Sequence, residues 1–133
     1  MNPLPILLKD FYKVSHIFQY PAGTQEVYSN FTPRGSRIEG IDHVVVFGIQ
    51  AFIEEYLINQ FNEGFFYTDK EDALAYFKRR MDTSLGPNAV DTKHLEALHD
   101  LGYLPIEIRA LPEGTLCPMR VPLLTVRNTH PDF

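Results

Sequence analysis

The spacing of apolar residues changes several times along the chain, and each change marks a predicted element. Residues 6–19 are predicted to form a short helix that ends before Pro21. Residues 24–32 (TQEVYSNFT) are rich in aromatic and β-branched side chains, which predicts a strand. A basic loop at 33–40 (PRGSRIEG) then leads to a second predicted strand at 42–47 (DHVVVF).

After Gly48 the apolar residues recur with the spacing of an amphipathic helix. Intervals of three and four residues place them on one side of a helix with 3.6 residues per turn. We therefore expect a helix that buries one stripe, formed by Ile49, Phe52, Ile53, Tyr56, Leu57 and Phe61.

A further helix is predicted to begin at Thr68, because Thr68 and Glu71 have the spacing of a capping box. Its last turn is expected to carry Lys78, Arg79 and Arg80. Cations there would be stabilised by the negative end of the helix dipole, so we interpret this cluster as a solvated helix end.

Another helix is predicted to start at Asp91 or Thr92 and to end at Gly102. The apolar spacing then falls to two residues, which is typical of half-buried strands. One such strand is expected at 104–110, and the PEG turn at 112–114 is expected to lead to short strands at 115–117 and 122–127. The order of helix, strands, helices and strands predicts an α+β fold with a largely antiparallel sheet and three or four helices.

Composition limits the classes of function. At 133 residues, with 44% hydrophobic and 22% charged positions, the chain is sized for one domain, which we expect to span residues 1–133. The chain has 12 Lys and Arg residues and 17 Asp and Glu residues. The resulting net charge of −5 disfavours nucleic acid binding. No apolar run approaches the roughly 20 residues of a membrane span, and no basic leader opens the sequence. We expect a cytoplasmic protein that binds neither nucleic acid nor membrane.

Residues alone supply few candidates for chemistry. The single cysteine, Cys117, excludes an internal disulfide, and the five histidines lack metal-binding spacing, so no metal site is expected in this chain. The basic loop between two predicted strands is the best remaining candidate. A guanidinium matches phosphate oxygens with two parallel hydrogen bonds. Arg34 and Arg37, with Ser36 as a helper, could therefore hold an anion.

Several long motifs resemble the N-terminal part of nicotinamide phosphoribosyltransferases. They are LLKDFYKVSHIFQYPAGTQEVYSNFTPRGSR, VVVFGIQAFIEEYL, LPIEIRALPEGTLCP and PLLTVRNTHPDF, in the same order as in that family. The resemblance implies the N-terminal α+β domain of a type II phosphoribosyltransferase. Such an enzyme joins nicotinamide to phosphoribosyl pyrophosphate and forms nicotinamide mononucleotide in NAD salvage. It requires Mg²⁺, and ATP hydrolysis improves its yield; both would bind mainly outside this chain.

The resemblance also assigns roles to four residues. It implies that Tyr12 stacks on nicotinamide across a homodimer interface, with Asp10 beside the same pocket. The rings of Phe11, Phe18 and Tyr20 are more simply explained as packing. Arg34 would contact the phosphate and pyrophosphate groups, also across the dimer. Ser36 stands near a lysine of some relatives, so a second phosphate contact is left to Arg37 or Ser36. No catalytic residue is expected in this chain.

The sequence is compatible with other roles and functions. On sequence pattern alone, Tyr12 is a core residue and Asp10 a helix-start residue. A nicotinate phosphoribosyltransferase has a similar domain plan, and a truncated, non-catalytic binding or dimerisation module would show the same motifs. The strand PLLTV is followed only by RNTHPDF. We therefore expect a chain cut before the catalytic barrel, which would be inactive by itself.

Overall fold

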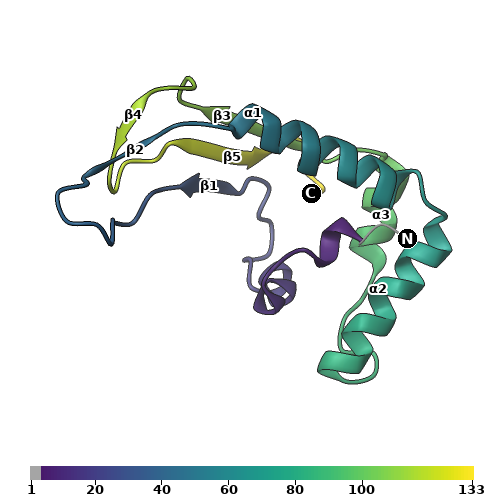
Figure 1. Ribbon diagram of the computed structural model, residues 1–133. Helices are drawn as coiled ribbons and strands as arrows, with labels where there is room; N and C mark the ends of the chain where they lie inside the picture. The colour runs from purple at the N-terminus through teal and green to yellow at the C-terminus, as the bar shows by residue number, and fades with distance from the viewer. Residues whose placement is uncertain (1–3) are drawn as a thin grey trace. The chain divides into compact units, whose positions relative to one another are not determined.

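A computed structural model describes residues 4–133, which form two compact units (Figure 1). The helical unit contains the chain up to Tyr20 and Ile53–Leu104, and the sheet unit contains Pro21–Phe52 and Pro105–Phe133. Helices and antiparallel strands are both present, so the predicted α+β class is confirmed. The assignment of residues 1–133 to one domain stays a prediction, and its first three residues lie outside the described part. Within residues 4–133, no helix is both long and apolar enough to cross a membrane.

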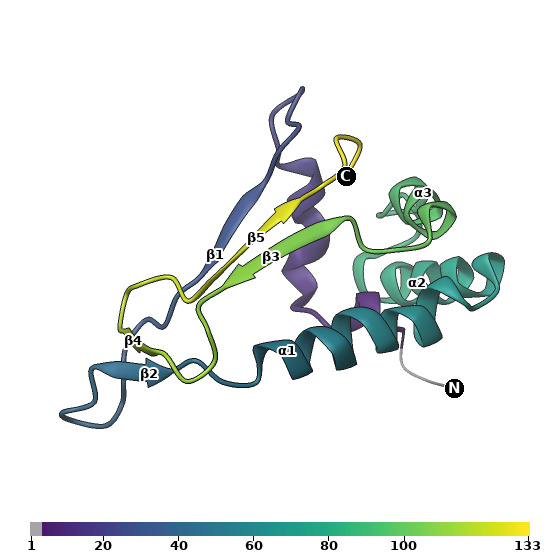
Figure 2. The ribbon, with the colours of Figure 1, turned by 90° about the horizontal axis from the view of Figure 1, so that it is seen from above.

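The sheet unit contains two antiparallel sheets. One has the order β1-β5-β3, and the other pairs β2 with β4 (Figure 2). The strand bounds are β1 Tyr28–Phe31, β2 His43–Val45, β3 Ile106–Ala110, β4 Leu116–Pro118 and β5 Leu124–Asn128. Each strand overlaps a stretch that the sequence predicted to be a strand.

A small apolar core holds the sheet unit together. It consists of Val46, Cys117 and Leu123. Val44 pairs with Cys117 across β2 and β4 and packs against this core, whereas the next pair, Val45 and Leu116, is exposed. Successive side chains of a strand point to opposite faces, which explains the difference. The free thiol of Cys117 is fully buried in this core.

Glu113 fixes the beginning of helix α1 (Ile49–Phe52). Its carboxylate accepts hydrogen bonds from the backbone N–H groups of Gly48 at 2.7 Å, Ile49 at 2.8 Å and Gln50 at 3.4 Å. Gly48 has a φ of +82°, which favours glycine at this turn into the helix. A carboxylate at this end satisfies N–H groups that have no partner within the helix and meets the positive end of the helix dipole.

We expect Glu113→Ala to lower the free energy of unfolding by about 1–2 kcal/mol, as loss of a helix cap does. Glu113→Gln keeps one acceptor oxygen, so its free energy of unfolding should lie between those of the unaltered chain and of Glu113→Ala. Urea denaturation would measure both. Glu39→Ala, which removes an exposed glutamate from the basic loop, is the control and should change stability by no more than about 0.5 kcal/mol. Equal losses for the glutamates at 39 and 113 would contradict the capping role.

The helix predicted after Gly48 forms, but the prediction of a buried stripe is wrong. The chain continues from α1 into the π-helical segments η3 (Ile53–Asn59) and η4 (Asn62–Phe66). Neither α1 nor η3 has a buried residue, and burial begins in η4 at Gly64, Phe65 and Phe66. The i→i+5 hydrogen bonds of a π-helix wind the chain more loosely than an α-helix. Of the predicted stripe, Ile49, Ile53, Leu57 and Phe61 are half-buried, whereas Phe52 and Tyr56 are exposed.

The predicted helix at 6–19 is divided into two 3₁₀ helices. These are η1 (Pro5–Leu7) and η2 (Phe11–Phe18). Pro5 fits the first turn of η1, where an N–H group would have no helical partner. Ile6 and Val14 are buried and anchor these segments in the core of the helical unit.

Helix α2 (Lys70–Leu85) is capped differently from the prediction. The side chain of Asp69 accepts a hydrogen bond from the N–H of Asp72 at 3.0 Å. The Thr68 hydroxyl instead donates to the carbonyl of Phe65 at 2.7 Å. Thr68 thus closes the preceding helical segment, and the Thr68–Glu71 capping box is wrong.

The helix also ends later than predicted. It continues to Leu85, so Lys78, Arg79 and Arg80 lie in its middle and its last turn has no basic residue. The proposed stabilisation by the helix dipole is therefore wrong, because that effect is confined to the terminal turns. Lys78 instead forms an ion pair with Asp82, four residues away, at 2.8 Å.

Helix α3 (Lys93–Leu101) begins after Thr92 and ends before Gly102, as predicted. Gly102 has left-handed backbone geometry, which glycine adopts without steric cost. Leu95 from α3 packs with residues of α2 and η4 in one core cluster. Its members are Leu4, Ile6, Val14, Phe65, Phe66, Ala73, Phe77, Met81, Val90 and Leu95.

Candidate substrate-binding site

The predicted ring-stacking residue, Tyr12, lies on the surface of η2. Its side chain is 61% exposed. The centres of the Tyr12 and His16 rings are 5.5 Å apart, and the two ring planes are inclined by 58°. Lys13 Nζ lies 5.3 Å from the centre of the Tyr12 ring. These contacts come from other residues of η2 and leave much of the ring accessible. The alternative of a core tyrosine therefore does not hold in this chain.

The neighbouring rings differ from the prediction. Phe11, Phe18 and Tyr20 were expected to pack inside, but all three are exposed. Val14 is the buried residue of η2. In a helix with three residues per turn, side chains at positions i and i+3 are eclipsed. Phe11 therefore shares the side of Val14 and Phe18 does not, while Tyr20 lies beyond the end of η2.

Asp10 precedes η2 and is exposed. Its backbone carbonyl accepts a hydrogen bond from the N–H of Lys13 at 3.0 Å, but its carboxylate makes no capping bond. The main chain of Asp10 thus starts the helix, and its charged group is left for another partner.

The residue before Asp10 is Lys9, and burial lowers the pKa of its amine. Lys9 Nζ lies 5.9 Å from the centre of the Phe77 ring.

Arg34 and Arg37 lie in a loop that is ordered by its own polar groups. The Ser36 hydroxyl accepts from the N–H of Ile38 at 2.9 Å and donates to the Ile38 carbonyl at 3.0 Å. Both arginines are exposed, and neither forms an ion pair with a carboxylate in residues 4–133. The two arginines thus lie in a loop with a defined turn, and Ser36 is occupied in forming that turn.

The base of this loop is joined to the connection between β4 and β5. The N–H of Arg120 donates to the carbonyl of Pro33 at 2.7 Å, and the N–H of Met119 donates to that of Asp42 at 2.8 Å. The Asp42 carboxylate also contacts the ring of His43 at 2.6 Å. This hydrogen bond lowers the pKa of the Asp42 carboxyl group. The loop is therefore closed at both ends by backbone hydrogen bonds.

The four predicted site residues are divided between the units. Asp10 and Tyr12 belong to the helical unit, and Arg34 and Arg37 belong to the sheet unit. Each pair is close in the sequence and shares one local segment. The aromatic and the cationic halves of the candidate site are thus carried by separate compact bodies.

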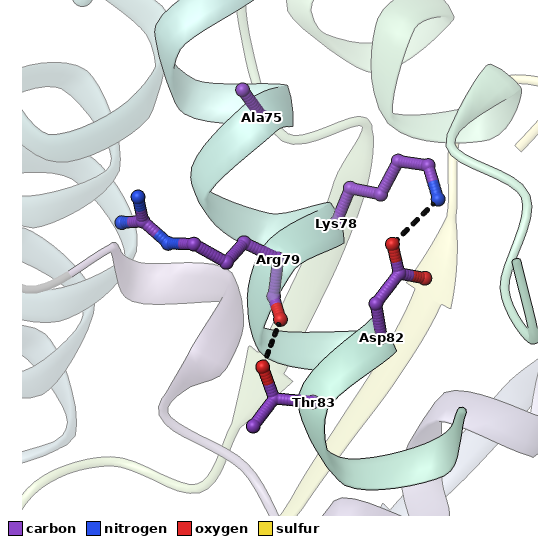
Figure 3. Close-up of a pocket in the computed structure, with 5 residues that line it drawn as sticks. All are labelled: Ala75, Lys78, Arg79, Asp82 and Thr83. Carbon is purple, nitrogen blue, oxygen red and sulfur yellow. Dashed lines mark hydrogen bonds and ion pairs between the residues drawn. The ribbon is translucent and has the colours of Figure 1, made fainter. Parts of the chain in front are cut away.

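The surface of α2 has a shallow depression of about 450 Å³ (Figure 3). Within it, Lys78 Nζ donates to Asp82 at 2.8 Å, and the Thr83 hydroxyl donates to the carbonyl of Arg79, also at 2.8 Å. The Arg79 guanidinium lies 5.3 Å from the ring of Tyr76. Most of these polar groups find partners on their own helix, and none of the predicted site residues lines the depression. We do not assign it to the substrate site.

The described residues were predicted to hold no metal ion. Among residues 4–133, no three His, Cys, Asp or Glu side chains are grouped as a metal ion requires. The Mg²⁺ that the resemblance implies therefore finds no ligand set in the described residues.

Comparison with known sequences decides the family. The sequence profile described as nicotinamide phosphoribosyltransferase, N-terminal domain, matches residues 5–108. The chain belongs to the nicotinamide phosphoribosyltransferase family. The family resemblance predicted from the sequence motifs is confirmed.

Two curated nicotinamide phosphoribosyltransferases align with this family member. The chain is 55% identical over 138 aligned positions to that of Acinetobacter baylyi (strain ATCC 33305 / BD413 / ADP1), covering 100% of the chain and 27% of the relative. It is 31% identical over 125 aligned positions to that of Xanthomonas campestris pv. campestris (strain 8004), covering 93% of the chain and 24% of the relative. The chain spans about a quarter of the length of the curated relatives it matches.

Proposed function

We propose that this chain is the N-terminal substrate-binding and assembly domain of an enzyme that transfers phosphoribosyl from phosphoribosyl pyrophosphate to nicotinamide. The products would be nicotinamide mononucleotide and pyrophosphate, as in NAD salvage. The observation that carries the proposal is the 55% identity to a nicotinamide phosphoribosyltransferase over the whole chain. Both named relatives are nicotinamide phosphoribosyltransferases, which supports nicotinamide rather than nicotinate as the acceptor.

Tyr12 is assigned to nicotinamide, with Asp10 beside it. An exposed aromatic ring suits this role, because it can stack on a flat heteroaromatic ring without first leaving a core. The site would be shared across a homodimer, so that Tyr12 of one subunit completes the pocket of its partner. Asp10 keeps a carboxylate that its own helix does not use.

Arg34 and Arg37 are assigned to the phosphate and pyrophosphate groups. Their guanidinium groups are exposed and have no carboxylate partner in the described chain. Charge-assisted hydrogen bonds from arginine to phosphate are among the stronger hydrogen bonds in proteins. Arg37 is the better candidate for the second contact, because Ser36 is engaged within the loop.

The remaining chemistry is assigned to parts of the enzyme beyond these residues. Mg²⁺ would neutralise charge on the departing pyrophosphate, and ATP would improve the yield. Residues 4–133 contain no grouped ligands for the metal. We further propose a cytoplasmic location.

The test of this function uses the complete enzyme that carries these residues. We expect it to form nicotinamide mononucleotide, and the isolated 133-residue chain to form none. Arg34→Ala should raise the Michaelis constant for phosphoribosyl pyrophosphate far more than that for nicotinamide, because a lost hydrogen bond to a charged group costs about 1.5–3 kcal/mol.

Arg80→Ala is the matched control. It removes the same charge from the exposed surface of α2 and should leave both constants unchanged. Failure of the complete enzyme to use nicotinamide and phosphoribosyl pyrophosphate would refute the function. An unchanged Michaelis constant for phosphoribosyl pyrophosphate in an active Arg34→Ala enzyme would refute only the assignment of Arg34 to that substrate.

A further inference from the structure

A third arginine lies beside the loop that carries Arg34 and Arg37. The N–H of Arg120 donates to the carbonyl of Pro33 at 2.7 Å. Pro33 is bonded directly to Arg34, and consecutive Cα atoms are only about 3.8 Å apart. The backbones of Arg34 and Arg120 are therefore neighbours, although the two residues lie far apart in the sequence.

The backbone of Arg120 has an uncommon conformation. Its φ is +66°, in the left-handed region that disfavours residues with a Cβ atom. Its side chain is exposed and belongs to neither core cluster, so apolar packing does not explain a large residue here. Residues held in such conformations concentrate at binding and catalytic sites, which makes this arginine a candidate for function.

The charges around the loop favour an anion. Arg34, Arg37 and Arg120 are exposed, and none of them forms an ion pair in residues 4–133. Of the acidic groups on this loop, the Asp42 carboxylate is bonded to the ring of His43, and Glu39 is exposed. By contrast, Arg109 and Arg127 in the same unit both pair with Glu107.

We propose that Arg120 joins Arg34 in binding a pyrophosphate group, with the Arg120–Pro33 hydrogen bond holding the two guanidinium groups on one side of the loop base. A long side chain that extends from a fixed backbone position can reach the same anion as its neighbour. The planar guanidinium fork suits the oxygens of adjacent phosphates. This inference rests on the proposed function, because it extends the donor site by one residue from another part of the chain.

The experiment follows the arginine side-chain Nε–Hε signals of the 133-residue chain by NMR during titration with inorganic pyrophosphate, without metal. We expect saturable shifts for Arg34 and Arg120 that give one common Kd. Arg120→Gly and Arg34→Ala should each raise this Kd about tenfold or more, as loss of a charge-assisted hydrogen bond does. Arg120→Lys keeps the charge without the fork and should give an intermediate Kd.

Two controls separate binding from folding. Glycine adopts a positive φ freely, so Arg120→Gly should melt at the same temperature as the unaltered chain or higher. Weaker binding by that variant would then not result from unfolding. Arg80→Ala removes one positive charge from α2 and should leave the Kd unchanged. Ribose 5-phosphate, titrated separately, should bind more weakly than pyrophosphate, because it offers one phosphate instead of two.

The outcomes distinguish this inference from the proposed function. If Arg34→Ala weakens binding and Arg120→Gly does not, Arg120 has only a backbone role; the inference fails and the donor assignment of Arg34 stands. If the unaltered chain shows no saturable shifts, or if Arg80→Ala weakens binding equally, the inference also fails. The activity of the complete enzyme would still decide the proposed function independently.

Discussion

Replacing Phe77 with alanine is expected to lower the free energy of unfolding by about 3–5 kcal/mol, the usual cost of truncating a buried aromatic residue. The Phe77 side chain is 1% exposed and lies in the same core cluster as Phe65 and Met81. Small domains are stable by only about 5–15 kcal/mol, so this loss is a large part of the total. Urea denaturation followed by circular dichroism would measure it.

Tyr12→Ala is the matched aromatic truncation on the surface. It should change the free energy of unfolding by no more than about 0.5 kcal/mol, because an exposed ring leaves no cavity when it is removed. Phe77→Leu should lower the free energy of unfolding by less than Phe77→Ala does, since leucine keeps more of the buried volume. If Tyr12→Ala and Phe77→Ala were equally destabilising, the Tyr12 ring would have to be buried in solution.

In the complete enzyme, Tyr12→Ala is expected to raise the Michaelis constant for nicotinamide severalfold to tenfold while the fold persists. Aromatic stacking contributes about 0.5–1.5 kcal/mol beyond the burial of surface, and about 1.4 kcal/mol corresponds to a factor of ten. Tyr12→Phe should have a mild effect, because stacking needs the ring and not the hydroxyl group. Steady-state kinetics with nicotinamide as the varied substrate would measure both variants.

Mixed dimers test whether the ring acts on the partner subunit. One lesion is Tyr12→Ala, and the other disables the catalytic barrel. When both lesions are on one subunit, the intact barrel faces the altered position and should bind nicotinamide poorly. When the lesions are on different subunits, the working barrel receives Tyr12 from its partner and should bind normally. If the second arrangement is the impaired one, Tyr12 acts within its own subunit and the shared site is refuted.

Local sequence determined much of the secondary structure. The two-residue apolar spacing at 104–110 and the β-branched run at 42–47 each gave a strand, because a half-buried strand requires such alternation or enrichment. Gly102 ended α3 because glycine tolerates the left-handed geometry of a helix end. The long motifs containing Asp10, Tyr12 and Arg34 also predicted the family that the comparisons show.

Hydrogen-bond competition within the fold decided details that local patterns left open. Thr68 had the spacing of a cap, but its hydroxyl donates to Phe65, and Asp69 caps α2 instead. The stripe after Gly48 had helical spacing, but the chain winds there partly as a π-helix, and no residue of α1 or η3 is fully buried. Each of these segments could form more than one set of hydrogen bonds, and only the folded backbone shows which set forms.

The sequence by itself determined which segments are helical and which are extended, the family, and the candidate residues on each local segment. Only the tertiary structure placed Glu113 on the start of α1 and Arg120 beside Pro33. Both contacts join segments far apart in the sequence, and their formation depends on how β2, β4 and β5 are paired. Periodicity and spacing report on neighbours along the chain. Contacts between distant segments depend on strand pairing and packing, and so only the folded chain reveals them.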